Sequence, residues 1–89
     1  MAAYSLLTSK RAERDLDKIR DKSALRRIVE KIDALQHDPR PPGVRKLMGS
    51  DMDYRIRIGD YRVVYQINDR ARTVLICGVG DRKDIYRGL

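Results

Sequence analysis

The sequence predicts a small α+β domain in which a helical hairpin packs on one face of a mostly antiparallel four-stranded sheet. Three observations predict this class. With 89 residues, the chain can form one layer of helices on one sheet and little more. Apolar residues recur at helical spacing in the first half. From Tyr54 onward they alternate with polar residues, which is the period of a strand. The expected order is β-α-α-β-β-β.

A strand and a short amphipathic helix are expected near the N-terminus. The apolar run at residues 4–7 predicts the strand, and Thr8 or Ser9 can cap a helix that starts at Lys10. Three apolar residues then recur at helical spacing between charged ones: Ala12, Leu16 and Ile19. This spacing gives the helix one apolar face.

A second helix is expected from a cap at Asp21 or Ser23 to about Gln36, where Pro39 stops it. Its apolar residues follow the i, i+3, i+4, i+7 pattern of one buried face: Leu25, Ile28, Val29, Ile32 and Leu35. The two helices should form an antiparallel hairpin, and the only histidine, His37, should lie at the end of the second helix.

The second half predicts a loop, an irregular segment and three strands. Residues 39–43 are rich in proline and glycine, which favours a loop, and residues 44–53 show no regular pattern. The strands are expected at residues 54–58, 61–67 and 73–79, with the last, nearly continuous apolar strand central in the sheet.

The two-residue loop Gly59-Asp60 sets the register of the first hairpin. One face then carries the core side chains: Tyr54, Ile56, Ile58, Tyr61, Val63, Tyr65 and Ile67. The other face carries Arg55, Arg57 and Arg62, with Arg57 directly opposite Arg62 and their β-carbons about 4.5–5.5 Å apart. Opposed like charges destabilise a sheet, so a phosphate bound above them would explain the cluster. The alternative is a solvated face whose arginines extend into water.

Charge and composition point to anionic partners and exclude several kinds of site. The formal net charge is +7, and fourteen of the twenty cations are arginine, whose planar fork matches phosphate oxygens. One cysteine, Cys77, and one histidine allow no disulfide framework and no zinc site within one chain, and Cys77 is expected to be a small buried side chain. No apolar run approaches 18 residues and no signal peptide is recognisable, so we expect a cytoplasmic protein without a membrane partner.

A second group of polar residues follows the last strand. Gly78 and Gly80 remove side chains where that strand ends, which permits a ligand to approach the backbone. Arg82 and Tyr86 are therefore candidates for the rim of the same site. The alternative is an ordinary polar tail.

Three linked segments resemble the RelE family of bacterial toxins. They are Tyr54-Arg-Ile-Arg-Ile58, Gly59-Asp-Tyr-Arg-Val-Val-Tyr65 and Val79-Gly-Asp-Arg-Lys-Asp-Ile-Tyr86, and the similarity extends over nearly the whole chain. The resemblance implies that residues 1–89 form a single RelE-like toxin domain. It further implies a translation-blocking endoribonuclease that cuts messenger RNA in the ribosomal A site and is held inactive by a cognate antitoxin.

The resemblance also implies roles for individual residues. Catalysis is expected from Arg57, Arg62, Arg82 and Tyr86, and RNA binding from Arg55, Lys83 and Arg87. Attack by the 2′-hydroxyl of RNA on its own phosphate requires no metal and no cofactor, so none is expected. Many relatives carry a histidine where this chain has Asp81, and an aspartate there would lower the local positive potential.

Two other functions are compatible with the same residues. One is a ParE-like DNA gyrase inhibitor without ribonuclease activity, against which the arginine and tyrosine set argues. The other is a non-catalytic RNA-binding module that uses the basic face without turnover.

Overall fold

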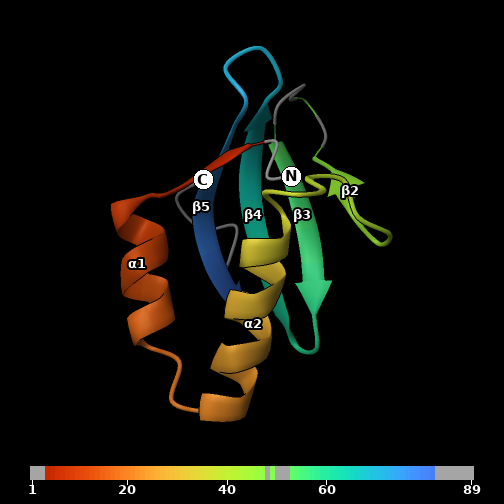
Figure 1. The fold of residues 1–89 in the computed structure, drawn as a ribbon. Coiled ribbons are helices and arrows are strands. Elements are labelled where there is room, and N and C mark those ends of the chain that lie inside the picture. The colour runs from red at the N-terminus through yellow and green to blue at the C-terminus, as the bar shows by residue number, and fades with distance from the viewer. Residues whose placement is uncertain (1–3, 48, 50–52, 82–89) are drawn as a thin grey trace.

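The computed structural model describes residues 4–47, 49 and 53–81, and it contains two helices and five strands in this part of the chain. They are β1 (Ser5–Thr8), α1 (Lys10–Asp17), α2 (Lys22–Ala34), β2 (Arg45–Lys46), β3 (Asp53–Ile58), β4 (Tyr61–Asn68) and β5 (Thr73–Asp81). The helices run in opposite directions on the same face of the sheet (Figure 1). The predicted α+β class, with a helical hairpin on one face, is confirmed.

The strand order is β1-β5-β4-β3-β2, with β1 parallel to β5 and every other pair antiparallel. The predicted count of four strands was wrong, because β2 forms inside the segment that was expected to be irregular. This strand has two residues, too few to show an alternating pattern, and exists through its pairing with β3. The last strand was expected to be central in the sheet. β5 does have a neighbour on each side, but the middle strand of the five is β4.

Side-chain oxygens cap both helices at the expected positions. Ser9 accepts a hydrogen bond from the backbone N–H of Ala12 at 3.1 Å, and Asp21 accepts from Ser23 at 3.0 Å and Ala24 at 3.2 Å. α1 ends at Asp17, two residues before Ile19, and α2 ends at Ala34, ahead of a turn at residues 35–37. No helix in the described ranges is long and apolar enough to span a bilayer.

The core lies between the two helices and the facing side of β3, β4 and β5. Its fully buried members include Ala12, Ile28, Leu35, Val63, Tyr65, Val74 and Ile76. Val29 belongs to the predicted apolar stripe of α2 but is 40% exposed, because the stripe is wider than the surface that the sheet covers. The buried Tyr65 hydroxyl donates to the carbonyl of Pro39 at 2.8 Å, which fixes the loop after α2 on the sheet.

A polar network joins three loops at one end of the sheet. The Arg40 guanidinium forms two hydrogen bonds to Asp69, of 3.2 and 2.8 Å, and a third and fourth of 3.3 Å to the Tyr54 hydroxyl. Tyr4 donates its hydroxyl proton to Asp69 at 2.6 Å. The hydrogen bonds from Arg40, and to a smaller extent the one from Tyr4, lower the pKa of Asp69 to about 2. The network connects the N-terminus, the loop after α2 and the β4–β5 turn.

Candidate functional site

The register of β3 and β4 places three arginines on the sheet face that is opposite the helices. Arg57 pairs with Arg62 and Arg55 with Val64, as the two-residue loop predicted. Core residues alternate with these arginines along both strands, so the three side chains share the other face. Arg57 is exposed, whereas Arg55 and Arg62 are half-buried.

The Arg57 side chain is turned toward the hairpin turn. Its Nε donates to the carbonyl of Gly59 at 3.3 Å, which turns the guanidinium toward the tip of the hairpin. Gly59 has a φ of +59°, a backbone conformation that glycine adopts without strain and that this turn requires. The hydrogen bond uses one nitrogen, and the two terminal nitrogens of Arg57 have no partner among the described residues.

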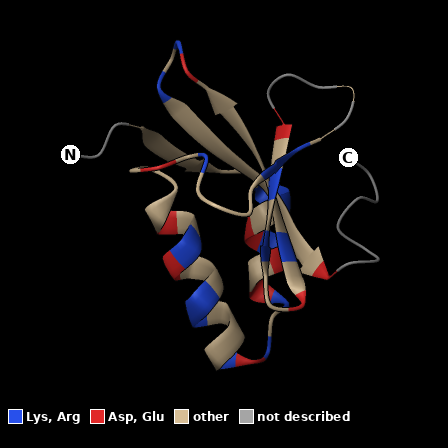
Figure 2. Ribbon diagram, turned by 90° about the vertical axis from the view of Figure 1, so that its right-hand side faces the viewer, with Lys and Arg blue, Asp and Glu red and all other residues tan. Residues whose placement is uncertain are grey.

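β2 brings a fourth arginine to this face, which sequence reasoning missed. Arg45 pairs with Arg55, and directly opposed residues of an antiparallel pair project to the same side. A basic pair before an apolar residue was the only sequence feature that marked this segment. We call Arg45, Arg55, Arg57 and Arg62 the arginine face. Figure 2 shows Lys and Arg along β2 and β3, at the edge nearest the viewer, and mixed signs along the helices.

On β5, the strand next to β4, the residues that face Arg62 and Val64 are glycines and carry no side chain. In the β4–β5 pairing Arg62 lies opposite Gly80, and Val64 lies opposite Gly78. Gly80 is half-buried and has no side chain that could block a ligand beside Arg62, whereas Gly78 is buried. The predicted approach of a ligand to the backbone therefore remains a prediction at Gly80 only. Val64 shares the arginine face yet is only 3% exposed, so this face is partly apolar at its base.

A β-bulge and helix α1 fix the end of β5. The register shifts between Val64 and Tyr65, which skips Cys77 on the facing strand. Ser9 at the start of α1 donates its hydroxyl proton to the Cys77 carbonyl at 3.0 Å, and Asp15 accepts from the Val79 backbone N–H at 2.9 Å. β1 ends opposite Ile76, so α1 supplies partners beyond the point where strand pairing stops.

The cysteine and the histidine do not act as catalytic groups in this arrangement. Burial, with a smaller contribution from Asp53, raises the pKa of the Cys77 thiol, which makes the thiolate nucleophile scarcer. His37 is exposed in the turn that follows α2, at the helix end as predicted. Within the described ranges, no three His, Cys, Asp or Glu side chains gather where they could hold a metal ion.

Four of the predicted site residues lie outside the described residues: Arg82, Lys83, Tyr86 and Arg87. Their roles remain predictions. The last described residue, Asp81, ends β5 opposite Tyr61, next to the pair formed by Arg62 and Gly80.

The arginine face has the properties of an anion-binding surface. No carboxylate in the described part of the chain forms an ion pair with Arg45, Arg55 or Arg62. Strand pairing fixes the backbone of all four arginines, so their side chains start from fixed positions on one face before a ligand arrives. Such a preorganised cluster can stabilise negative charge that develops on a phosphate.

Comparisons with known proteins agree with this arrangement. Residues 6–86 match the family described as "ParE toxin of type II toxin-antitoxin system, parDE". A candidate toxin, RelE1, of Methanocaldococcus jannaschii is 33% identical over 87 residues, covering 94% of this chain and 96% of that protein.

Solved structures with the same fold include toxin–antitoxin complexes. The archaeal RelE–RelB complex of Pyrococcus horikoshii superimposes with a TM-score of 0.80 and 31% identity, covering 92% of this chain and 98% of that chain. The RelBE2 complex of Mycobacterium tuberculosis gives a TM-score of 0.75 and 29% identity, covering 90% and 99%. The chain therefore belongs to the RelE/ParE family of toxins of type II toxin–antitoxin systems.

Proposed function

We propose that this toxin is a metal-independent endoribonuclease that cleaves messenger RNA in the ribosomal A site and so blocks translation. One observation supports it most: four arginines are held on one face by strand register, and the residue opposite Arg62 on β5 is Gly80, which has no side chain. A gyrase inhibitor has no need of such a cluster, whereas phosphate cleavage does.

The proposed reaction begins with attack of a ribose 2′-oxygen on the adjacent phosphorus. The 2′-hydroxyl proton goes to a base, the bond from phosphorus to the 5′-oxygen breaks, and that oxygen takes up a proton. The products are a 2′,3′-cyclic phosphate and a free 5′-hydroxyl. Every atom comes from RNA and from exchangeable protons, so no cofactor is consumed.

Each site residue has a role in this scheme. Arg57 and Arg62 stabilise the additional negative charge on the phosphate during the attack. Arg82 is assigned the same role and Tyr86 the proton transfer. Three further cations, Arg55, Lys83 and Arg87, hold the RNA or the ribosome. The ribosome as the site of action places the toxin in the cytoplasm.

The cognate antitoxin is proposed to present apolar residues together with acidic side chains. A surface with net positive charge attracts acidic groups, and the apolar residues supply contact area. The RelE toxin of Pyrococcus horikoshii was solved in complex with RelB, and the RelBE2 toxin of Mycobacterium tuberculosis was also solved in a toxin–antitoxin complex. Production of this chain alone should slow growing cells, and production with its antitoxin should not. High production alone without any slowing would refute a toxin function.

The match to the ParE family supports gyrase inhibition as a second candidate. Induction of the toxin in cells that receive a labelled amino acid and labelled thymidine separates the two. A ribonuclease should stop amino-acid incorporation first and leave transcripts that end in 2′,3′-cyclic phosphates. If thymidine incorporation stops first and transcripts stay intact, the toxin is a gyrase inhibitor.

A further inference from the structure

A groove of about 460 Å³ lies between α2 and the β3–β4 hairpin, beside the arginine face. Its lining comes from one side of α2 and from the end of β3: Arg27, Glu30, Lys31, Arg57, Ile58 and Gly59. Arg57 belongs to both surfaces, because it lines the groove and also stands opposite Arg62 on the sheet. The groove therefore continues the arginine face around the tip of the hairpin.

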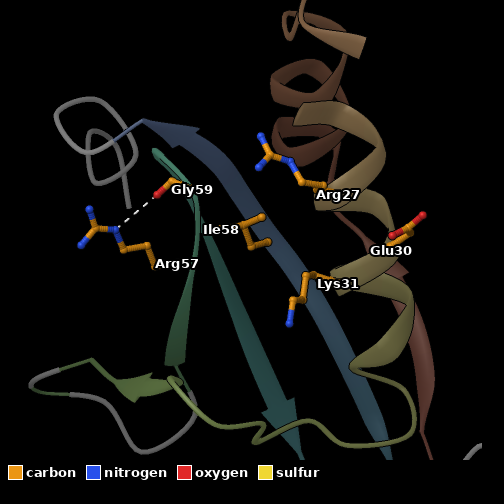
Figure 3. Close-up of a pocket in the computed structure, with 6 residues that line it drawn as sticks. All are labelled: Arg27, Glu30, Lys31, Arg57, Ile58 and Gly59. Atoms are coloured by element: carbon orange, nitrogen blue, oxygen red, sulfur yellow. Dashed lines mark hydrogen bonds between the residues drawn. The ribbon is translucent and has the colours of Figure 1, made fainter. Parts of the chain in front are cut away.

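The two cations of α2 extend into this groove, whereas its one carboxylate faces outward and Arg57 points away from α2 (Figure 3). Figure 3 shows Arg27 and Lys31 extending from α2 toward the strands, whereas Glu30 points away from them. Arg27 and Lys31 are four residues apart, so they are neighbours on the helix, and like charges at this spacing destabilise it. Among the described residues, neither has an ion-pair partner. A bound anion would convert this repulsion into attraction.

The lining favours a phosphate over an apolar partner segment. Ile58 is the only large apolar side chain in it and is 8% exposed, which leaves little apolar area for a helix to cover. Arg27 reaches the end of the groove at the hairpin turn, since a β-carbon on Gly59 would lie 4.0 Å from Arg27 Nη2. A groove of this size, within the range of small-ligand sites, suits a single nucleotide unit.

We propose that this groove binds a phosphate of the RNA strand whose scissile phosphate lies on the arginine face. The RNA strand passes from Arg62 to Arg57 and then to Arg27 and Lys31. Cations on both the sheet and α2 therefore hold consecutive parts of the RNA backbone. This assignment rests on the proposed ribonuclease function and adds to it a second binding position on α2. The contacts are to phosphates, so they add affinity without sequence preference.

Two double variants with equal charge test the groove. Arg27→Gln with Lys31→Gln removes both groove cations, and Lys22→Gln with Arg26→Gln removes two exposed cations of the same helix that do not line it. Each pair changes the formal net charge from +7 to +5. The probe is a fluorescent 2′-O-methyl RNA of about 12 nucleotides, a length within single-strand site sizes. It lacks the attacking hydroxyl, so binding is measured without cleavage.

We expect the groove variant to bind the probe about 5-fold more weakly at about 0.1 M salt, because one lost phosphate contact removes about 0.7 from the slope of log K against log salt. Its slope should accordingly become shallower by about 0.7. The control variant should bind like the parent and keep the parent's slope. Equal losses in the two variants would assign the effect to net charge and overturn the proposal.

Two further measurements separate the possible failures. Polyglutamate serves as a second probe, and a groove variant that loses polyglutamate binding alone would assign the groove to an acidic protein partner instead. Cleavage of natural RNA by the parent tests the proposed function independently. If the parent cleaves RNA and the groove variant binds the RNA probe as tightly as the parent, the groove proposal fails while the ribonuclease function stands.

Discussion

Arg62 is the most constrained cation of the arginine face. Arg57 stands opposite it on β3, and Gly80 stands opposite it on β5, so it has a like charge on one side and open backbone on the other. A phosphate can occupy the space above Gly80 and be held by both arginines. Its half-buried position limits the directions in which the guanidinium can move, which is what a preorganised donor requires.

Replacing Arg62 with alanine should therefore reduce RNA cleavage by roughly 10² or more, the usual effect of losing such a donor. Lysine at this position keeps the charge but loses the planar fork, so Arg62→Lys should recover only part of the activity. Single-turnover cleavage measures both variants, and thermal unfolding checks that they fold. A folded Arg62→Ala protein that still arrests growth like the parent would remove this face from the catalytic site.

Tyr86, which lies outside the described residues, is proposed to carry out the proton transfer. An unperturbed tyrosine with a pKa near 10 is a weak base at neutral pH, but neighbouring cations favour the phenolate. Tyr86→Phe keeps the ring and removes the hydroxyl. It should leave RNA affinity near normal and slow single-turnover cleavage by roughly 10² to 10⁴. Unchanged cleavage in Tyr86→Phe with a loss in Tyr86→Ala would show that the ring stacks on a base.

At the level of elements, α1 does more than cover the sheet. β5 stays paired with β4 to its end but loses its other partner, β1, after Ile76, and on that edge α1 then supplies the Ser9 hydroxyl and the Asp15 carboxylate. α1 therefore holds backbone groups at the end of β5, the last described strand, beside the pair formed by Arg62 and Gly80.

Asp15→Ala should lower the free energy of unfolding by about 1–3 kcal/mol, because it leaves the Val79 N–H without an acceptor. Asp15→Asn retains an oxygen at the same place and should recover most of this loss. Urea unfolding measures the stability, and hydrogen exchange at the Val79 amide reports the local effect. An Asp15→Ala protein with parental stability and a protected Val79 amide would show that strand pairing alone holds this end.

The Arg40–Asp69 network predicts a pH dependence. The pKa of Asp69 is lowered from 3.8 to about 2, so its ionised form is favoured by folding. The stabilisation is fully present above about pH 4 and is lost as the pH falls toward 2. The difference in Tm between the parent and Asp69→Asn should be constant at neutral pH and shrink below pH 4. A difference that stays constant down to pH 2 would mean that the Asp69 charge does not contribute.

The elements that were predictable are those whose pattern is local. The loop Gly59-Asp60 fixed the hairpin register, and from it the shared face of Arg55, Arg57 and Arg62. β2 was not predictable, because two residues carry no period and pair only when β3 is already in place. Arg45 was missed with it. The exposure of Val29 depends on how far the sheet extends under α2. The helical spacing of apolar residues does not show how much of the helix the sheet covers.

For the molecule as a whole, the layering could be predicted and the surfaces between layers could not. A helical hairpin on one side of the sheet follows from the two periods in the sequence. The groove beside Arg57 depends on the rotation of α2 over β3, which brings residues about 30 positions apart in the chain together. The attraction of the two proposed partners, an anionic substrate and an acidic antitoxin, is likewise a property of the whole surface. The same net charge of +7 would attract both.

This shared attraction predicts how the antitoxin binds. Long-range charge speeds the encounter, whereas apolar contacts hold the complex once it has formed. Raising ionic strength from about 0.01 M to about 0.1 M shortens the Debye length from about 30 Å to about 10 Å. We expect this change to slow association at least about tenfold and to leave the dissociation rate within about threefold. Stopped-flow mixing of the toxin with its antitoxin measures both rates. An association rate that is insensitive to salt would mean that contacts other than charge select the partner.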